Sequence, residues 1–457
     1  MATQPAFSAL LNGDDPLKLY ARHVNPQFVR LLRTIGFDVR WQRGEGAYLY
    51  DEAGNRYLDM VGGFGMFNVG RNNARVRAAL EEALAAETPG SVQLGVSPLA
   101  GLLARELLAR VPERLGRALF TNSGTEAVEA ALKLGRAATG RPRVLSTEKG
   151  FHGLTLGSLS AAGCDEFSGP FLPLLDGFER VPFNDVEGLE RELQREDVAV
   201  FLVEPIQGKG VVMPEPGYLE RAQELCRRYG TLFCVDEVQT GLGRTGKLFA
   251  FEHWGLEPDL VPVAKSLSGG YVPSGACLLR SDVFDRVFDS LEHSVRHGST
   301  FAPNDLAMAA GIATLRELDE QGIVEHAARM GGLLLELTQP LVERYDVIGD
   351  VRGLGLIWAV EFREPQRHRH SWRLLERAQG GIFAQLVVLP LLQDHRILTQ
   401  VAGHGLNVLK ILPPLTITAE DLTTFAQALD TAIARAARIP TAAARLAFQA
   451  AAHSLRA

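Results

Sequence analysis

The chain has 457 residues, of which 46% are hydrophobic and 22% are charged, as is ordinary for a folded soluble protein. Its formal net charge of -7 and its pI near 5.9 argue against a nucleic-acid-binding protein. The four cysteines form no CxxC pair, so neither a disulfide framework nor a metal site is predicted. The N-terminal residues lack the pattern of a signal peptide, and no run of about 18 apolar residues suggests a membrane span, so we expect a cytoplasmic protein.

The first part of the chain predicts an irregular arm, a helix and a hairpin within residues 1–60. The hairpin is indicated by two strand-like runs around the turn sequence Glu52-Ala53-Gly54-Asn55. Residues 61–70 are rich in glycine and predict a loop, which either lets the backbone approach a ligand or is a plain connection. Residues 74–88 and 98–111 predict amphipathic helices.

Between residues 118 and 279, short apolar runs alternate with helical segments, interrupted by a loop-rich excursion at 165–184. This alternation predicts a mainly parallel sheet that is covered by helices on both faces. In open sheets of this kind, ligands bind just beyond the carboxyl ends of the strands. The polar residues that follow the predicted strands are therefore candidates for a functional site.

Two of these strand-end residues are ionisable. Asp236 follows the apolar run 232–235, and Lys265 follows the run 260–264. Burial lowers the pKa of a lysine and provides a neutral amine that can form a Schiff base. Pyridoxal phosphate (PLP) needs such an amine and an acid that keeps its ring nitrogen protonated. Taken singly, each residue is more often a surface lysine or a turn residue, but the pair, with glycine-rich loops behind it, favours a functional site.

A second candidate site lies where a predicted strand at 118–121 meets a helix that runs to about Thr139. The junction Ser123-Gly124-Thr125 offers backbone N–H groups, two hydroxyls and the positive end of a helix dipole, which suit a phosphate. The alternative is a capping box between Ser123 and Glu126 that stabilises the helix without any ligand. The motif by itself does not decide between the two.

The pattern changes after residue 322. We expect a helix, strands at 345–351 and 355–362, and a further helix that starts near Thr418. This part predicts an α+β lobe packed with the N-terminal arm. Residues 431–457 predict an Ala/Arg-rich helix that is broken at Pro440.

Six motifs then occur in order: SGTEAVE (123–129), FHG (151–153), EPIQG (204–208), DEVQTGLGRTG (236–246), AKSLSGG (264–270) and HGSTF (297–301). Together they resemble the class III aminotransferases, which are PLP-dependent enzymes of fold type I, from the hairpin at 47–60 to the Pro-Pro-Leu at 413–415. The resemblance implies an α/β fold. A large PLP-binding domain (61–325) would hold a mainly parallel seven-stranded sheet, and a smaller α+β domain would combine residues 1–60 and 326–457.

The resemblance also implies roles for individual residues. Lys265 matches the Schiff-base lysine, Asp236 the partner of the pyridine nitrogen, and Ser123, Gly124 and Thr125 the phosphate-binding residues. The other implied cofactor contacts are Phe151 and Val238 on the two ring faces, Gln239 at the ring hydroxyl, Thr300 at the phosphate of the neighbouring subunit, and His152 and Glu204. Each active site would then be shared within a homodimer that acts on small amines, amino acids and carbonyl compounds, without nucleic acid or membrane as a partner.

The implied activity is ping-pong amino transfer, but two positions depart from the family pattern. Many members have a glutamate and an arginine where this chain has Lys209 and Lys410, and that pair admits the α-carboxylate of glutamate. A lysine attracts a carboxylate without a bidentate fork, so the departure argues against this mode of recognition. It points instead to an amine or aldehyde of a biosynthetic pathway. Lys209, Lys410 and Phe64 are the predicted substrate contacts.

Two other functions stay open from the sequence. The altered positions also suit a relative that uses the same carbanion chemistry for racemisation, decarboxylation or side-chain substitution of an amino acid. A non-catalytic binding protein with this fold is the third option, against which the presence of both Lys265 and Asp236 argues.

Overall fold

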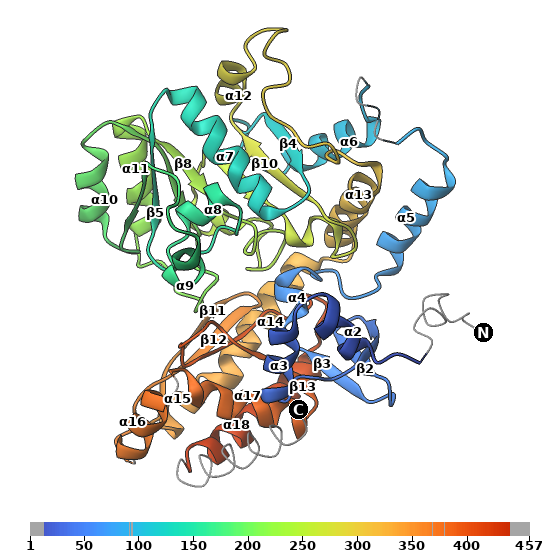
Figure 1. Cartoon of the computed structure of the whole chain (residues 1–457), viewed down its shortest axis with the longest axis vertical. Helices are drawn as coiled ribbons and strands as arrows, with labels where there is room; N and C mark the ends of the chain where they lie inside the picture. Colours follow the sequence, from blue (N-terminus) through green and yellow to red (C-terminus); the bar gives the residue numbers. More distant parts are fainter. Residues whose placement is uncertain (1–12, 91, 93–94, 368, 379, 439–457) are drawn as a thin grey trace.

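The computed structural model describes residues 13–438 except for 91, 93–94, 368 and 379. The predicted N-terminal arm up to residue 12 and the predicted helix break at Pro440 lie outside the described residues. Figure 1 shows the elements from the middle of the chain around one large sheet, while the blue N-terminal and the orange-red C-terminal elements lie together below it.

The large sheet has seven strands in the order β4-β10-β9-β8-β7-β5-β6. All its pairings are parallel except the two made by β10, which confirms the predicted mainly parallel sheet. The strands are β4 (Arg117–Thr121), β5 (Arg143–Thr147), β6 (Phe178–Val181), β7 (Val198–Val203), β8 (Leu232–Val235), β9 (Leu260–Val263) and β10 (Gly275–Leu279).

Helices cover both faces of this sheet, because successive side chains of a strand point to opposite sides. Val200 and Leu202 of β7 belong to one apolar cluster together with α7 and α12, whereas Phe201 and Val203 belong to another with α10 and α11. The helices of this part are α5 (Ala74–Ala85), α6 (Pro98–Leu108), α7 (Gly124–Thr139), α8 (Leu156–Ala161), α9 (Asp165–Ser168), α10 (Val186–Leu193), α11 (Tyr218–Tyr229), α12 (Ser281–Val287) and α13 (Asp305–Glu320).

Two segments predicted as loops contain regular elements, and helices α5 and α6 each end three residues earlier than predicted. The excursion at 165–184 contains the edge strand β6, of whose four residues only Val181 is fully buried, so its apolar pattern is weak. The glycine-rich segment after residue 60 contains one short turn, α4 (Gly62–Gly65). Gly63 and Phe64 in this turn have φ of 62° and 61°, so a regular right-handed helix does not propagate through it.

The remaining elements come from both ends of the chain. The predicted hairpin is formed by β2 (Tyr48–Asp51) and β3 (Arg56–Asp59), flanked by β1 (Trp41–Glu45) and by β13 (Ile397–Leu398), which runs parallel to β3. An antiparallel sheet has the order β11-β12-β15-β14, with β11 (Ile348–Leu354), β12 (Ile357–Phe362), β15 (Val408–Ile411) and β14 (Gln400–Val401). The helices here are α2 (Pro16–His23), α3 (Pro26–Thr34), α14 (Ile323–Thr338), α15 (Pro340–Arg344), α16 (Arg369–Ala378), α17 (Ile382–Gln393) and α18 (Ala419–Ala436).

This arrangement matches the expected α+β lobe, except that β11 begins and ends three residues later than predicted and β12 begins two residues later. The division of the chain near residues 60 and 325 stays a prediction. In the described part of the chain, every helix is too short or too polar to cross a membrane.

Candidate active site

Four neighbouring parallel strands, in the order β9-β8-β7-β5, bring their carboxyl ends to one edge of the large sheet. Lys265 follows β9 after one residue, Asp236 follows β8 directly, and Glu204 follows β7 directly. Phe151 and His152 lie in the connection after β5. The fold therefore gathers at one edge the side chains that the sequence predicted for a common site.

Asp236 is held by two hydrogen bonds. Its Oδ1 accepts from the backbone N–H of Val238 at 3.0 Å, and its Oδ2 lies 2.8 Å from Nδ1 of His152. Burial disfavours the protonated ring of His152, but the hydrogen bond and the charge of Asp236 outweigh burial and raise the pKa of His152. Nε2 of His152 is buried and has no hydrogen-bond partner among the described residues.

Lys265 opens the short 3-10 turn η3 (Lys265–Ser268) with a φ of 44°, an uncommon conformation for a residue other than glycine. Its side chain is partly buried. Burial lowers the pKa of Lys265, while the charges of Asp236 and Glu204 act in the opposite direction. The side chain of Lys265 therefore loses its proton at a lower pH than an exposed lysine does.

Glu204 joins two loops of the site. Its Oε1 accepts from the N–H of Phe151 at 2.9 Å, and its Oε2 accepts from the N–H of Gly208 at 2.7 Å. Burial raises the pKa of Glu204. The ring of Phe151 is partly buried and meets the edge of the Phe167 ring, with 5.4 Å between the ring centroids.

The start of α7 forms only half of the predicted capping box. The hydroxyl of Ser123 accepts from the N–H of Glu126 at 3.3 Å, but the carboxylate of Glu126 accepts from the N–H of Asn122 at 2.7 Å. The first N–H groups of a helix have no acceptor inside it, so this turn can bind an anion. The hydroxyl of Thr125 lies 2.8 Å from that of Thr155 and 2.5 Å from that of Ser158.

Gly124 brings this helix start against the residues around Asp236 and Lys265. A Cβ at Gly124 would lie 2.8 Å from Cγ1 of Val238 and 3.4 Å from Cβ of Ala264. The contact leaves no room for a side chain at position 124. The anion-binding turn, Val238 and the residue that precedes Lys265 therefore meet at one place.

Gln239 connects three segments. Its Nε2 donates to the carbonyl of Phe64 at 3.3 Å, and its Oε1 accepts from Nζ of Lys410 at 3.2 Å. Lys410 also donates to the carbonyl of Gly208 at 2.6 Å. Burial, together with the charge of Lys265, lowers the pKa of Lys410 to about 7. The side chain of Phe64 is exposed.

Lys209 does not join this group. Its Nζ lies 2.7 Å from Oε1 of Glu166 and 3.6 Å from Sγ of Cys164. The two lysines that the sequence paired as substrate contacts therefore have separate surroundings.

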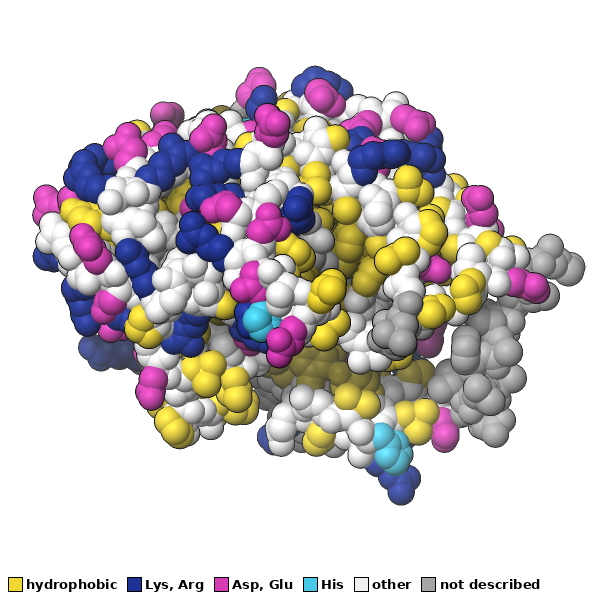
Figure 2. All heavy atoms as spheres, turned by 90° about the horizontal axis from the view of Figure 1, so that it is seen from above, with side chains coloured by type: hydrophobic (Ala, Val, Ile, Leu, Met, Phe, Trp, Pro, Cys, Tyr) yellow, Lys and Arg dark blue, Asp and Glu magenta, His cyan; other side chains and the backbone are white. Residues whose placement is uncertain are grey.

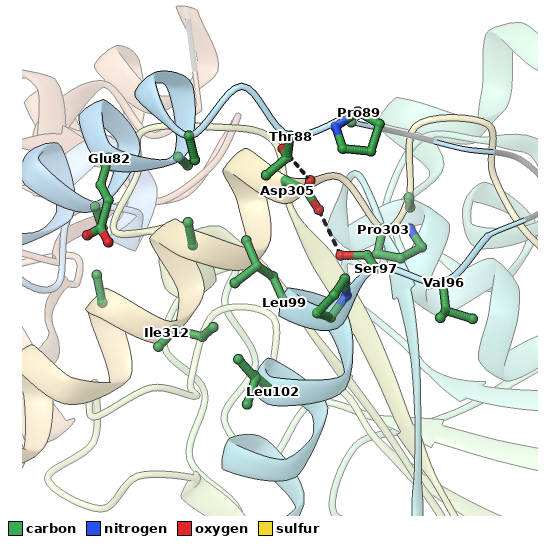
Figure 3. Close-up of a pocket in the computed structure, with 18 of the residues that line it drawn as sticks. Glu82, Thr88, Pro89, Val96, Ser97, Leu99, Leu102, Pro303, Asp305 and Ile312 are labelled. Atoms are coloured by element: carbon green, nitrogen blue, oxygen red, sulfur yellow. Dashed lines mark hydrogen bonds between the residues drawn. The ribbon is translucent and has the colours of Figure 1, made fainter.

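Thr300 is exposed, and the hydroxyl of its neighbour Ser299 accepts from Nδ2 of Asn122 at 2.8 Å in the same chain. Thr300 also lines a cavity of about 1040 Å³ between α5, α6 and α13, whose lining does not include Lys265 or Asp236. Figure 3 shows Asp305 at this cavity, where it accepts from Ser97 at 2.7 Å and from Thr88 at 3.1 Å.

Arg244 is a residue to which the sequence analysis gave no role. It is fully buried and donates to the carbonyls of Leu356 at 3.0 Å and Pro413 at 2.6 Å and to Oδ1 of Asn68 at 2.6 Å. Burial lowers the pKa of Arg244 to about 9. The signal that could have found it is its place as the one basic residue of the motif at 236–246.

The chain is similar to known proteins over most of its length. The family model described as Aminotransferase class-III matches residues 34–433. The putrescine aminotransferase of Pectobacterium atrosepticum is 40% identical over 91% of this chain and 87% of its own length. The aminotransferase PigE of a Serratia species is 36% identical over 94% of this chain, which spans only 55% of the length of PigE.

Solved structures with this fold are also found. The ornithine aminotransferase of Toxoplasma gondii ME49 superposes with a TM-score of 0.77 at 31% identity, covering 92% of this chain and 99% of that one. The omega transaminase of Pseudomonas jessenii in complex with PMP superposes with a TM-score of 0.84 at 26% identity, covering 93% and 99%.

Proposed function

The chain belongs to the class III aminotransferases, and on that premise we propose that it is a PLP-dependent enzyme that moves an amino group from an amine or amino acid to a carbonyl acceptor. The observation that carries the proposal is the position of Lys265 and Asp236 after neighbouring parallel strands, beside the start of α7. An amine, a carboxylate and an anion-binding turn are the three groups that PLP requires.

The residues present fit this cofactor. The amine of Lys265 suits its aldehyde, and the carboxylate of Asp236 suits its ring nitrogen. The N–H groups of Gly124 and Thr125 and the hydroxyl of Ser123 suit its phosphate. The absence of a side chain at Gly124 lets this turn lie against Val238. We propose that the flat ring of the cofactor lies between Val238 and Phe151.

When bound, PLP supplies an electron-withdrawing ring that weakens the bond to hydrogen at the substrate carbon. Lys265 would hold the aldehyde of the cofactor and, as a free amine, would carry the proton that leaves the substrate carbon, for which its lowered pKa is suited. Asp236 keeps a proton on the ring nitrogen, and His152 and the N–H of Val238 keep Asp236 in place. Gln239 would donate to the ring hydroxyl, and Thr300 would bind the phosphate in the neighbouring subunit of a dimer.

We also propose that the donor carries its reacting amino group on a terminal carbon, since two relatives are a putrescine and an ornithine aminotransferase. The test is a panel of monoamines, diamines and α-amino acids added to the purified PLP form, with the absorbance change of amino transfer as the readout. We expect diamines or other terminal amines to convert the cofactor fastest. Conversion by no donor, together with racemisation or decarboxylation of an amino acid without any acceptor, would overturn the proposal.

A homodimer is supported by the apolar surface around the large cavity. Val96 is 94% exposed, Phe301 71% and Leu102 40%, and single chains rarely expose so many large apolar side chains together. Figure 2 shows hydrophobic side chains gathered around a hollow on one face, with charged side chains beside it. We expect light scattering to give twice the mass of the chain, and a monomeric mass would contradict this.

A cytoplasmic location is supported by the four cysteines, which are all free thiols, as is usual in a reducing compartment. Fractionation of cells that produce the protein is the direct test.

A further inference from the structure

Lys410 reaches the candidate site from a different sheet. It lies on β15, where it pairs with Ala359 of β12 and Gln400 of β14. All four residues of β15 are buried, and Lys410 itself is 5% exposed. Its ammonium ends between the loop after β7 and the loop after β8, where it donates to Gly208 at 2.6 Å and to Gln239 at 3.2 Å.

The contact fixes which way the amide of Gln239 points. Nζ of Lys410 has at least two N–H bonds in either protonation state, and it donates them to the carbonyl of Gly208 and to Oε1 of Gln239, so the amide oxygen faces the lysine. The NH2 group then lies on the other side, where one N–H is donated to the carbonyl of Phe64. An amide NH2 has two N–H bonds, so the second is left for an acceptor on a bound group.

Gly208 makes this contact possible. A Cβ at Gly208 would lie 2.6 Å from Oε1 of Gln239 and 2.9 Å from Oε2 of Glu204. The amide oxygen is therefore packed against the backbone of Gly208 and the ammonium of Lys410, with no space in which to rotate freely.

We propose that Lys410 is a positioning residue for amino transfer, which holds the Gln239 amide so that its NH2 group faces the cofactor. The inference rests on the proposed function, since it needs the ring hydroxyl of PLP as the acceptor. Lys410 acts through Gln239 and need not touch the substrate.

The test compares Lys410→Met, Gln239→Leu and the double variant with the wild type, all loaded with PLP. A donor to the ring hydroxyl favours its ionised form, so either single substitution should move the pH midpoint of the cofactor's visible absorbance upward. We expect a shift of roughly one pH unit, the equivalent of about one hydrogen bond. We also expect an amino-transfer half-reaction that is roughly tenfold slower.

The double variant separates positioning from a direct effect of charge. If Lys410 acts through Gln239, Lys410→Met causes no further shift in the Gln239→Leu background, because such pairs are not additive. If the lysine acts by its charge on the cofactor, the shift persists in that background, and this outcome would overturn the proposal. An unchanged midpoint in Lys410→Met would overturn it as well.

Two further variants complete the experiment. Gly208→Ala displaces the Gln239 oxygen without altering Lys410, so it should reproduce the upward shift even if Lys410→Met does not fold. Lys247→Met makes the same change at an exposed lysine and should leave the midpoint in place. The absorbance titration needs no amino donor, so its result stays separate from a failure of the proposed aminotransferase activity.

Discussion

Nδ1 of His152 lies 2.8 Å from Oδ2 of Asp236, and the side chain of His152 has no exposed surface. A carboxylate only accepts hydrogen bonds, so Nδ1 carries the proton. The second carboxylate oxygen is held by the N–H of Val238. Each partner of this buried pair therefore satisfies the other, and removing either leaves a polar group without its hydrogen bond.

His152→Leu should impair the enzyme through Asp236. Loss of the donor leaves the charged carboxylate with one hydrogen bond instead of two, so Asp236 is held less firmly at the ring nitrogen. A hydrogen bond to a charged group contributes about 1.5–3 kcal/mol, so we expect kcat to fall about 10–100-fold. His395→Leu, at an exposed histidine, is the control, and an unchanged kcat in His152→Leu would contradict this role for the pair.

Lys265→Ala should abolish covalent attachment of the cofactor and amino transfer with it. Borohydride reduction of the wild type followed by peptide mass mapping should place the label on Lys265. The matched control is Lys247→Ala, since Lys247 is the exposed lysine nearest in sequence before Lys265. A label on another residue in the wild type, or full turnover by Lys265→Ala without added amine, would refute the assignment.

Asp236→Asn should keep the cofactor attached but slow proton removal from the substrate. A neutral amide does not favour a charged ring nitrogen as a carboxylate does. We expect the half-reaction to slow by at least about 100-fold, the lower range for a proton-transfer contribution. Stopped-flow absorbance measures this rate, and a rate equal to that of the wild type would show that Asp236 does not contact the ring nitrogen.

Gly124→Ala should weaken cofactor binding, because its Cβ would lie 2.8 Å from Cγ1 of Val238. The added methyl group must push α7 and the Asp236 loop apart, and we expect the Kd for PLP to rise at least about tenfold, the equivalent of about 1.4 kcal/mol. Gly332→Ala lies on the exposed side of α14, where nothing is within 4 Å of the new Cβ, and should stabilise its helix by about 0.5–1 kcal/mol. Equal PLP affinity in the two variants would contradict the packing argument.

Lys410 should make the stability of the chain depend on pH in a defined direction. Its pKa is lowered from 10.5 to about 7 by burial, so the folded chain releases this proton near pH 7 while the unfolded chain keeps it up to about 10.5. Between these pH values the unfolded state binds more protons than the folded state. Lys410 therefore makes the free energy of unfolding increase as the pH rises. Urea unfolding at one protein concentration should show a difference between wild type and Lys410→Met that increases from pH 7 to 9 in favour of the wild type. The difference in the free energy of unfolding between wild type and Lys247→Met should not change over the same pH range.

The sequence was sufficient to predict the elements that carry Lys265 and Asp236. The apolar run 232–235 before Asp236 forms β8 with the same bounds, and the run 260–264 before Lys265 forms β9 with one residue fewer, because short apolar runs flanked by turn residues are typical of buried strands. Strand β6 was missed because an edge strand buries few side chains. The sequence also did not predict which way the side chain of Lys410 points. Every residue of β15 is buried, so no alternation of polar and apolar residues marks its two faces.

The strand β13 illustrates a limit of another kind. It has only two residues, Ile397 and Leu398, which is too short for any period in the sequence, yet it completes the sheet begun by the N-terminal hairpin. Its pairing with β3 can be seen only in the folded structure.

This pairing has a consequence for the order of events on the ribosome. Leu58 and Asp59 are made early, but their neighbours Ile397 and Leu398 emerge only when most of the chain has been translated. Until then, β3 of the nascent hairpin has an unpaired edge. A substitution that makes this edge more prone to aggregate would lower the yield of folded protein without changing the activity of the folded enzyme.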